Sequence, residues 1–263
     1  NISDTAQKHG SGVAGNIAML IKEFGLENYI KIYPIKANSA DKDTFDFTVL
    51  AKALDWATDN AGASVINMSL GRSKKDYDTL SSVVRSTFEV AIAKANTKSV
   101  VVAAAGNEAK PDTNPDDIFY PAGLEGVVSV MNEGKDGNLY SKSNYGLSYS
   151  LCAPGESIYT ANGYSANTSL YHETGGTSIA ASMVSFGTAL LKLRMQIEGR
   201  SVDAPTLAKT VKAFTVKTVK KGDMTLRALD LNTIAAGNID EINYDYQLPS
   251  ALSLVHDGTL GSG

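Results

Sequence analysis

The sequence feature that most constrains the fold is a continuous apolar run, VVVAAA, from Val100 to Ala105. A strand with one face in water alternates apolar and polar residues, whereas a strand covered on both faces is apolar throughout. The run follows a strand-like stretch at 63–70 and two stretches of helical periodicity, at 47–60 and about 77–95. Strands that alternate with helices favour a parallel sheet. We therefore predict a three-layer, doubly wound α/β fold, with a mostly parallel sheet and helices on both faces.

Further stretches extend this alternation in both directions along the chain. Apolar residues at helical spacing predict an amphipathic helix that begins at His9 and stops at Gly25. The other expected elements are strands at 29–35, 127–131 and 153–160, a long helix at 178–195 and a helix at 204–214. A chain of 263 residues with 43% hydrophobic content can bury the core of one such domain, so we predict a single domain over residues 1–263.

The charge and hydropathy of the chain argue against several classes of partner. A formal net charge of -4 provides no basic surface for nucleic acid or for an anionic membrane. No apolar run approaches the roughly 18 residues of a membrane span, and the sequence shows no secretory signal peptide. The single cysteine, Cys152, cannot form an internal disulfide and is expected to be a small buried apolar residue.

A Gly-Gly-Thr-Ser turn leads directly into the long helix, so that Ser178 falls in the helix's first turn. The N–H groups at a helix N-terminus are unpaired and the helix dipole is positive there, so both favour an oxyanion beside Ser178. Gly175 and Gly176 have no side chains and would let a substrate backbone approach. The hydroxyl of Ser178 is thus a candidate nucleophile. The alternative is that Ser178 is only the N-cap, a position that serine favours.

Two other polar residues lie where such chemistry would need them. Asn107 follows the apolar run, at the carboxyl edge of the sheet where ligands bind in this class of fold. Its amide could stabilise an oxyanion, and the alternative is an ordinary turn residue after Gly106. His9 opens a helix of small residues that can lie close to another backbone, so its imidazole could act as a general base. The alternative is a capping or surface histidine.

Four motifs, in order, resemble those of the subtilisin-like serine proteases, the subtilases. HGSGVAG is similar to the family's histidine motif, SVINMSLG to its substrate-binding strand, AAAGNE to its oxyanion-asparagine motif and GGTSIAAS to its serine motif. YPAG, VVSV, SNYG and APGESIYTA also follow the family's order, and the resemblance spans about residues 9–236. It implies Ser178 as nucleophile, His9 as general base and Asn107 as the side-chain donor of the oxyanion hole. It also implies two peptide-binding edges, which consist of Ser69, Leu70 and Gly71, and of Ala104, Ala105 and Gly106.

The resemblance also implies an activity, partners and a location. The expected activity is that of a serine endopeptidase that cleaves extended polypeptides through an acyl-enzyme and requires no cofactor for its chemistry. A propeptide or a protein inhibitor would be a further partner. Secretion, or another extracytoplasmic location, is the family's commoner habit, and an intracellular location stays open.

Many subtilases bind structural calcium, and two groups of carboxylates are candidates for it. They are Asp41, Asp43 and Asp46, and Asp112, Asp116 and Asp117. Their spacing lacks the Asp/Asn and glycine pattern of a known calcium loop, so solvated loops are the favoured interpretation and calcium is the alternative.

The sequence departs from the family's pattern in three respects. Gly12 stands where the family usually has a second histidine, and Ser182 where it usually has a proline; we interpret both as packing changes. The triad aspartate of subtilases lies on a strand upstream of the histidine. Here the residues before His9 are polar and too few to form that strand, and Asp4 lies too close to His9 along the chain.

A short apolar stretch near the end of the chain resembles the absent aspartate strand. Residues 251–255 lead into His256, Asp257 and Gly258. We interpret residues 241–263 as a displaced aspartate strand and 1–240 as the rest of the domain, which makes the chain circularly permuted. Asp257 would then accept the second ring N–H of His9. The alternatives are an Asp-Gly turn before a tail, or an aspartate that lies on a missing chain.

Two functions of other classes stay open beside the protease. Gly10, Gly12 and Gly15 match the GxGxxG fingerprint of dinucleotide sites, although no strand is predicted before them. A subtilase fold without catalysis could bind peptides or regulate a partner, but a degenerate site would be expected to lose the serine, the histidine or the asparagine. His172, in a polar loop before Ser178, is expected to be solvated or substrate-adjacent rather than catalytic.

Overall fold

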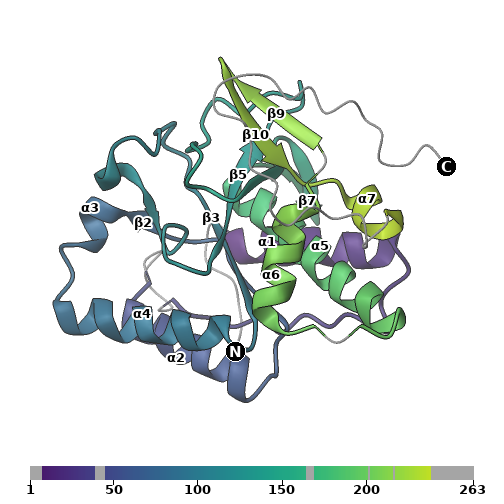
Figure 1. The fold of residues 1–263 in the computed structure, drawn as a ribbon, viewed down its shortest axis with the longest axis horizontal. Helices are drawn as coiled ribbons and strands as arrows, with labels where there is room; N and C mark the ends of the chain where they lie inside the picture. The colour runs from purple at the N-terminus through teal and green to yellow at the C-terminus, as the bar shows by residue number, and fades with distance from the viewer. Residues whose placement is uncertain (1–7, 39–44, 164–168, 201, 216, 238–263) are drawn as a thin grey trace.

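A computed structural model describes residues 8–38, 45–163, 169–200, 202–215 and 217–237 (Figure 1). Its helices are α1 (His9–Glu23), α2 (Phe47–Asp59), α3 (Lys74–Tyr77), α4 (Ser82–Asn96), α5 (Thr177–Ile197), α6 (Ala204–Ala213) and α7 (Leu231–Ala236), with a 3-10 turn η1 at Pro115–Asp117. Its strands are β1 (Val65–Met68), β2 (Arg72–Ser73), β3 (Val100–Ala104), β4 (Phe119–Tyr120), β5 (Val128–Glu133), β6 (Leu151–Pro154), β7 (Ile158–Ala161), β8 (Tyr171–Thr174), β9 (Lys217–Lys221) and β10 (Met224–Ala228).

The central sheet has six strands in the order β1-β3-β5-β6-β10-β9 (Figure 1). Neighbouring strands from β1 to β10 run parallel, and β9 runs antiparallel to β10. The register places Val65 opposite Val100, and Ala104 opposite Val130. Two small antiparallel sheets, β2-β4 and β7-β8, accompany the central one. The prediction of a mostly parallel α/β sheet is confirmed.

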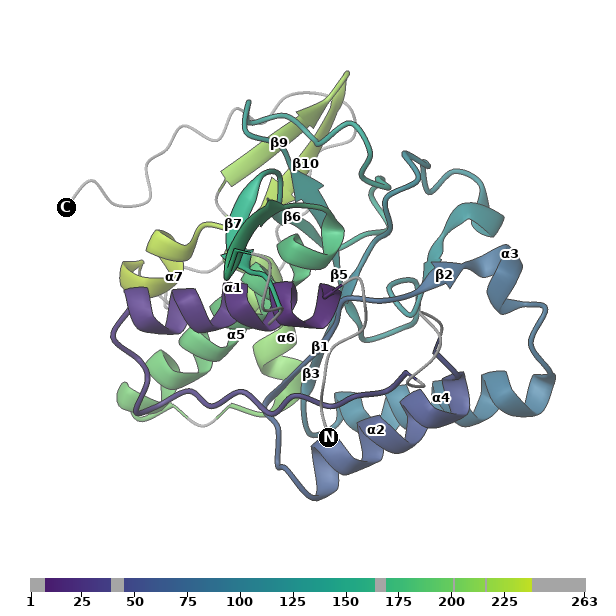
Figure 2. The same cartoon turned by 180° about the vertical axis from the view of Figure 1, so that it is seen from behind.

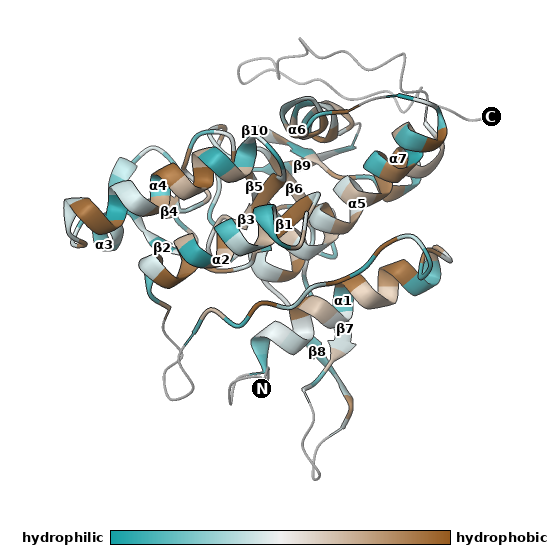
Figure 3. Ribbon diagram, turned by 90° about the horizontal axis from the view of Figure 1, so that it is seen from below, coloured by the Kyte–Doolittle hydropathy of each residue, from teal (hydrophilic) through white to brown (hydrophobic). Residues whose placement is uncertain are grey.

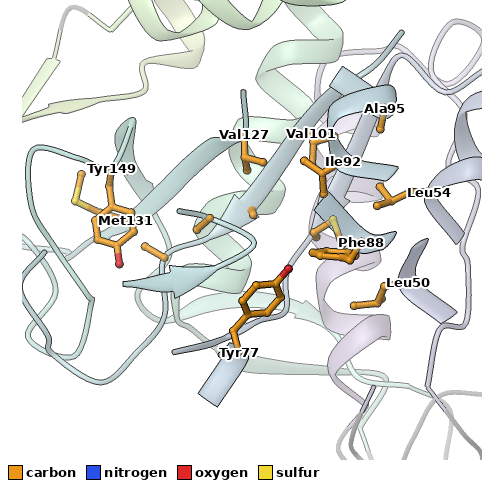
Figure 4. Close-up of a cluster of buried hydrophobic side chains, with 14 of the residues drawn as sticks. Leu50, Leu54, Tyr77, Phe88, Ile92, Ala95, Val101, Val127, Met131 and Tyr149 are labelled. Carbon is orange, nitrogen blue, oxygen red and sulfur yellow. The ribbon is translucent and has the colours of Figure 1, made fainter. Parts of the chain in front are cut away.

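Alternate residues of β3 pack on opposite faces of the sheet, which is why the run had to be apolar throughout. Val100 and Val102 belong to a core cluster with residues of α5 and α6, whereas Val101 and Ala103 belong to a second cluster with residues of α2 and α4. Figures 1 and 2 show the helices in these two layers, with α1 on the side of α5. Figure 4 shows the second cluster, where Phe88 lies with Ile92 and Leu54 near Val101. The fold therefore has three layers.

One predicted strand, residues 29–35, is wrong. This segment is extended but forms no ladder, and its side chains at Tyr29, Tyr33 and Ile35 are 40–68% exposed. It leads from the end of α1 toward α2 and carries hydrophobic residues along its length (Figure 3). The physical reason is that, among the described residues, no strand lies beside it to receive its hydrogen bonds. A cavity separates it from β1, the edge strand of the described sheet.

Other boundaries differ because of local capping and turns. The helix predicted at about 77–95 begins at Ser82 instead, because the Ser81 hydroxyl accepts a hydrogen bond from the Val84 N–H and caps α4 there, whereas Tyr77 ends the short helix α3. The predicted strand 153–160 is divided into β6 and β7, which lie in different sheets on either side of the Pro154-Gly155 turn. The β9-β10 hairpin was not among the predicted elements.

Candidate active site

The start of α5 places Ser178 at the end of the cavity. Gly176 occupies the N-cap with a φ of 124°, Thr177 begins the helix and Ser178 is its second residue. The positive φ explains the glycine, because residues with a side chain rarely adopt it. The alternative that Ser178 is the N-cap is therefore wrong, and its hydroxyl is available for other contacts.

Asn107 is held against the first turn of α5 through its side-chain oxygen. Its Oδ1 accepts hydrogen bonds from Thr177 N at 2.9 Å and from Thr177 Oγ1 at 3.3 Å. Thr177 Oγ1 in turn accepts a hydrogen bond from Gly106 N at 3.1 Å. A backbone N–H can only donate, so the amide must present its oxygen to Thr177. The Nδ2 hydrogens of Asn107 are left facing away from this contact, as an oxyanion donor requires.

Two hydrogen bonds join Ser178 to the end of β1. Ser69 Oγ donates to the Ser178 carbonyl at 2.7 Å, and Ser178 Oγ donates to the Ser69 carbonyl at 3.4 Å. Behind them, Asn67 Nδ2 donates to Ser69 Oγ at 2.9 Å and Ser185 Oγ donates to Asn67 Oδ1 at 3.0 Å. The 3.4 Å bond is long and therefore weak. The Ser178 hydroxyl can exchange it for a general base at little cost.

Helix α1 carries His9 and is fixed closely to the rest of the domain. Asn16 Nδ2 donates to Ser182 Oγ at 2.8 Å, in a buried contact between α1 and α5. A Cβ on Gly15 would lie 2.6 Å from the Cβ of Ala161, so α1 lies directly against β7. The small residues after His9 thus serve the close packing that the sequence predicts. Ser182 provides the α1 contact at the position where the family usually has proline.

The structure gathers most of the predicted site residues around one cavity of ≈ 1060 Å³. Its lining includes His9, Ser178, Asn107, Ser69, Leu70, Gly71, Ala104 and Gly106. Ala105 is fully buried in the core instead. The N–H groups of Ala105 and Gly106 are already bonded, to Val130 O and Thr177 Oγ1, so neither N–H is free to donate to a peptide, and of the two only Gly106 lines the cavity.

Asn144 is a supporting residue that the sequence analysis did not single out. Its side chain is buried, its Oδ1 accepts hydrogen bonds from Glu108 N and Lys110 N at 3.0 Å each, and its Nδ2 donates to Ala105 O at 2.9 Å. These bonds fix the loop that carries Asn107. The available signal was the SNYG motif, which by itself did not say what its asparagine contacts.

The remaining candidates lie apart from this site or serve the fold. Gly10, Gly12 and Gly15 lie inside α1 rather than in a loop before a helix, so they do not form a dinucleotide fingerprint. His172 lies on β8 with a buried Nδ1 that contacts no hydrogen-bond partner among the described residues, which corrects the expected solvated loop. Cys152 is fully buried, and burial raises the pKa of its thiol well above the usual range.

The carboxylates proposed for calcium have local partners. Asp46 is the N-cap of α2, Asp112 accepts a hydrogen bond from Ser148 N, and Asp117 accepts one from Asn114 Nδ2. Within the described ranges no three metal-ligating side chains are grouped so as to hold a metal ion. Asp41, Asp43 and Asp257 lie outside the described residues. No helix in the described part of the chain is long and apolar enough to cross a membrane.

The fold and the site together define an α/β protein with a serine in the first turn of a helix, a fixed asparagine amide beside that turn and a helix-borne histidine that lines the same cavity. The model of the subtilase family matches residues 1–251, and the chain belongs to that family. It is 32% identical over 187 residues to subtilisin DY of Bacillus licheniformis, a match that covers 70% of this chain and 62% of the relative. It is 27% identical over 187 residues to the major intracellular serine protease of Bacillus subtilis, which covers 70% of this chain and 54% of that protein.

Solved structures agree on the fold. The crystal structure of a lanthipeptide protease superposes with a TM-score of 0.72 at 21% identity, covering 91% of this chain and 77% of the other. At that identity the likeness shows the fold alone. The chain covers only part of the curated relatives that it matches: 62% of the length of subtilisin DY, and 47% and 49% of the length of two other relatives.

Proposed function

We propose that this protein is a serine endopeptidase. Ser178 Oγ attacks the carbonyl carbon of an extended peptide, and His9 takes the hydroxyl proton and delivers it to the leaving amine. Asn107 Nδ2 and the Ser178 N–H hold the oxyanion of the tetrahedral intermediate. The acyl-enzyme is then released by water, which His9 activates in the same way. The observation that carries this proposal is the fixed orientation of Asn107 beside Ser178, through two bonds to Thr177.

The substrate is a polypeptide that lies along residues 69–71, where β1 ends at the cavity. An extended peptide can add to such an edge through backbone hydrogen bonds. The reaction needs no cofactor, because the serine, the histidine and the amide supply the nucleophile, the base and the oxyanion donors. Structural calcium, a propeptide and a protein inhibitor belong to the same proposal as ligands outside the chemical step.

The triad aspartate is Asp257 in this proposal, and the cavity provides room for the strand that would carry it. From the catalytic end, the cavity continues along β1, the edge strand of the described sheet, between residues 64–68 and residues 29–38. A strand in a packed sheet fills roughly 160 Å³ per residue, from a rise of about 3.3 Å, a strand spacing of about 4.8 Å and a layer spacing of about 10 Å. The cavity of ≈ 1060 Å³ thus has room for a short strand.

The direction of the chain also suits this arrangement. Lys192 Nζ donates to Ser64 Oγ at 2.5 Å, so β1 begins near the C-terminal end of α5, while Ser178 lies at the other end of that helix. Arg194 Nη1 donates to Ile234 O at 2.9 Å and attaches α7 to the same end of α5. A segment that follows α7 and runs parallel to β1 would therefore enter at the distant end of the cavity and reach the catalytic end last.

The two sides of the cavity differ in a way that fits residues 251–257. Ala53, Leu54 and Ala57 of α2 line one side, and Ser185, Phe186 and Ala189 of α5 line the other. Alternate side chains of a strand point to opposite faces, so Leu252, Leu254 and His256 would share one face and Ser253, Val255 and Asp257 the other. We assign the second face to the side of α5 and α1, the layer that carries His9. The carboxylate is thereby directed to the side on which His9 lies.

The test of the chemistry is labelling with a fluorophosphonate probe, followed by mass spectrometry of the modified peptide. Wild type should be labelled at Ser178 and should hydrolyse a peptide substrate, and Ser178→Ala should lose both while its circular dichroism spectrum is unchanged. Asp257→Asn should reduce labelling steeply. Hydrolysis that persists in Ser178→Ala would exclude the mechanism. Equal labelling of Ser178 in wild type and in Asp257→Asn would show that the triad aspartate lies in another segment.

The strand arrangement is tested separately by a pair of cysteines. Under oxidation, Ala53→Cys with Leu254→Cys should form an intramolecular disulfide. The matched control, Val49→Cys with Leu254→Cys, should not, because Val49 is an exposed residue of α2 that does not line the cavity. Equal yields from the two pairs, or none from either, would show that residues 251–257 do not occupy the cavity.

The second candidate function is a subtilase fold that binds peptides without cleaving them. It would show peptide binding with no probe labelling in any variant. As to location, we propose a secreted or extracytoplasmic site of action, the commoner one among subtilases, although one relative is named an intracellular protease. Cell fractionation of the native source distinguishes the two.

A further inference from the structure

The ring of Phe119 lies between the two walls of the predicted peptide site. A Cβ placed on Gly71 would be 2.6 Å from Phe119 Cε1, and a Cβ placed on Gly106 would be 2.9 Å from Phe119 Cδ2. One edge of the ring therefore meets the wall that follows β1, and the other edge meets the wall that follows β3. Phe119 also lines the cavity together with Ser178 and Asn107. The ring closes the space between the walls beside the reacting groups.

The surrounding structure fixes Phe119 in this position. It lies on β4, which pairs with β2 so that Phe119 is opposite Ser73. Its N–H donates to the hydroxyl of Tyr149 at 3.2 Å, and its carbonyl accepts a hydrogen bond from Gly123 N at 2.8 Å. Tyr149 is buried, and burial raises the pKa of its phenol to about 12, so the hydroxyl stays neutral at physiological pH. These bonds fix the backbone of Phe119, and the contacts with Gly71 and Gly106 limit the positions of its ring.

The chemistry of acyl transfer places one substrate side chain next to this ring. The attacked carbonyl carbon must lie at Ser178 Oγ with its oxygen toward Asn107 Nδ2. The Cα of the residue that contributes this carbonyl is bonded directly to the attacked carbon. Its side chain therefore starts two bonds from the reacting carbon, at the part of the cavity that Ser178, Asn107 and Phe119 line together.

We propose that Phe119 restricts the residue on the acyl side of the cleaved bond to a small side chain, glycine or alanine. A large side chain at that position would have to displace a ring that contacts both walls. The proposal rests on the proposed peptidase function and names the substrate class of that same site. A pocket built for a larger side chain would instead leave the space between Gly71 and Gly106 open.

The experiment compares kcat/KM for chromogenic peptides that differ only in the residue on the acyl side, which is glycine, alanine or phenylalanine. Wild type should prefer glycine or alanine over phenylalanine. Phe119→Ala should shift the phenylalanine-to-alanine ratio of kcat/KM upward by about 10- to 200-fold, the range that differences in apolar pocket contacts produce. Phe119→Leu should give an intermediate shift.

Phe24→Ala is the matched control. Phe24 is a partly buried residue of the core periphery that contacts Phe186, with ring centroids 5.2 Å apart, and it does not line the cavity. It should lower stability without changing the ratio. A wild type that cleaves after phenylalanine as well as after alanine, or a Phe119→Ala variant with an unchanged ratio, would overturn the inference while labelling at Ser178 still supports the peptidase. A wild type with no labelling at Ser178 would overturn both.

Discussion

The Oδ1 atom of Asn107 accepts a hydrogen bond from the backbone N–H of Thr177 at 2.9 Å, across 70 positions of the sequence. This bond joins the loop that carries the oxyanion donor to the helix that carries the nucleophile. Because the same amide group has a bonded oxygen and a donor nitrogen, its rotation is restricted before a substrate arrives. Preorganised donors of this kind are the main source of electrostatic stabilisation in acyl transfer.

The first prediction distinguishes the role of Asn107 Nδ2 in catalysis from the role of Asn107 Oδ1 in stability. Asn107→Ala and Asn107→Asp should each lower kcat by about 100- to 1000-fold, the loss known for this donor in subtilisin, itself a subtilase, with little change in KM. Asn107→Asp keeps an oxygen for the Thr177 N–H, whereas Asn107→Ala leaves that donor without its partner. The midpoint temperature of thermal unfolding should therefore fall in Asn107→Ala but not in Asn107→Asp. A variant that keeps full kcat would remove Asn107 from the oxyanion hole.

The second prediction compares two glycines of α1. A Cβ at Gly15 would lie 2.6 Å from Ala161 Cβ and 2.9 Å from Ala161 N, so Gly15→Ala should be destabilising by about 1–3 kcal/mol through overpacking. The nearest atom to a Cβ at Gly12 is Thr160 Cγ2 at 3.5 Å, an ordinary contact. Gly12→Ala should therefore be neutral or stabilise the helix by up to about 1 kcal/mol.

Urea unfolding measures the free energy of unfolding of the two glycine variants, and kcat/KM for a peptide substrate measures their activity. Gly15→Ala should also lower activity, because α1 carries His9 and would have to shift away from β7. Equal stability of the two variants would contradict the contact between α1 and β7.

The third prediction concerns the pH dependence of stability at the start of α2. Asp46 Oδ1 accepts hydrogen bonds from Thr48 Oγ1 at 2.6 Å and from Thr48 N at 2.7 Å, and these bonds lower the pKa of the carboxyl in the folded state. A lowered folded-state pKa means that the carboxylate stabilises the fold above its unfolded value of about 3.9 and that this contribution is lost as the pH falls through the folded pKa.

Asp46→Ala should accordingly cost about 1 kcal/mol at neutral pH, as for other N-caps, and the difference from wild type should shrink below about pH 4. Asp46→Asn, which keeps an uncharged acceptor, should show a smaller dependence on pH. The free energy of unfolding measured in urea between pH 3 and pH 7 checks this. A constant difference between Asp46→Ala and wild type over that range would mean that the carboxylate charge has no part in the cap.

Elements that depend on a few neighbouring residues could be predicted from the sequence, whereas contacts between distant segments could not. The start of α1 at His9 and the start of α5 beside Ser178 were predicted, because helical spacing and a glycine turn before a helix are local properties. The predicted strand at 29–35 forms no ladder with any described residue. A strand needs a neighbour to bond, and the sequence of a segment does not specify its neighbour. The loop partners of Asn144 and the position of Phe119 between Gly71 and Gly106 depend on pairings between distant segments.

The sequence by itself determined the α/β class, the polar residues at the carboxyl edge of the sheet and the membership of a family with a serine at a helix N-terminus. Periodicity and residue type carry this information, because burial on one or two faces selects apolar residues at fixed spacings. Only the tertiary structure decided that Asn107 presents its oxygen to Thr177, that a cavity runs along β1 at the edge of the described sheet and that the ring of Phe119 lies between Gly71 and Gly106. Those facts arise from contacts between residues far apart in sequence, and such contacts are fixed when the layers pack together.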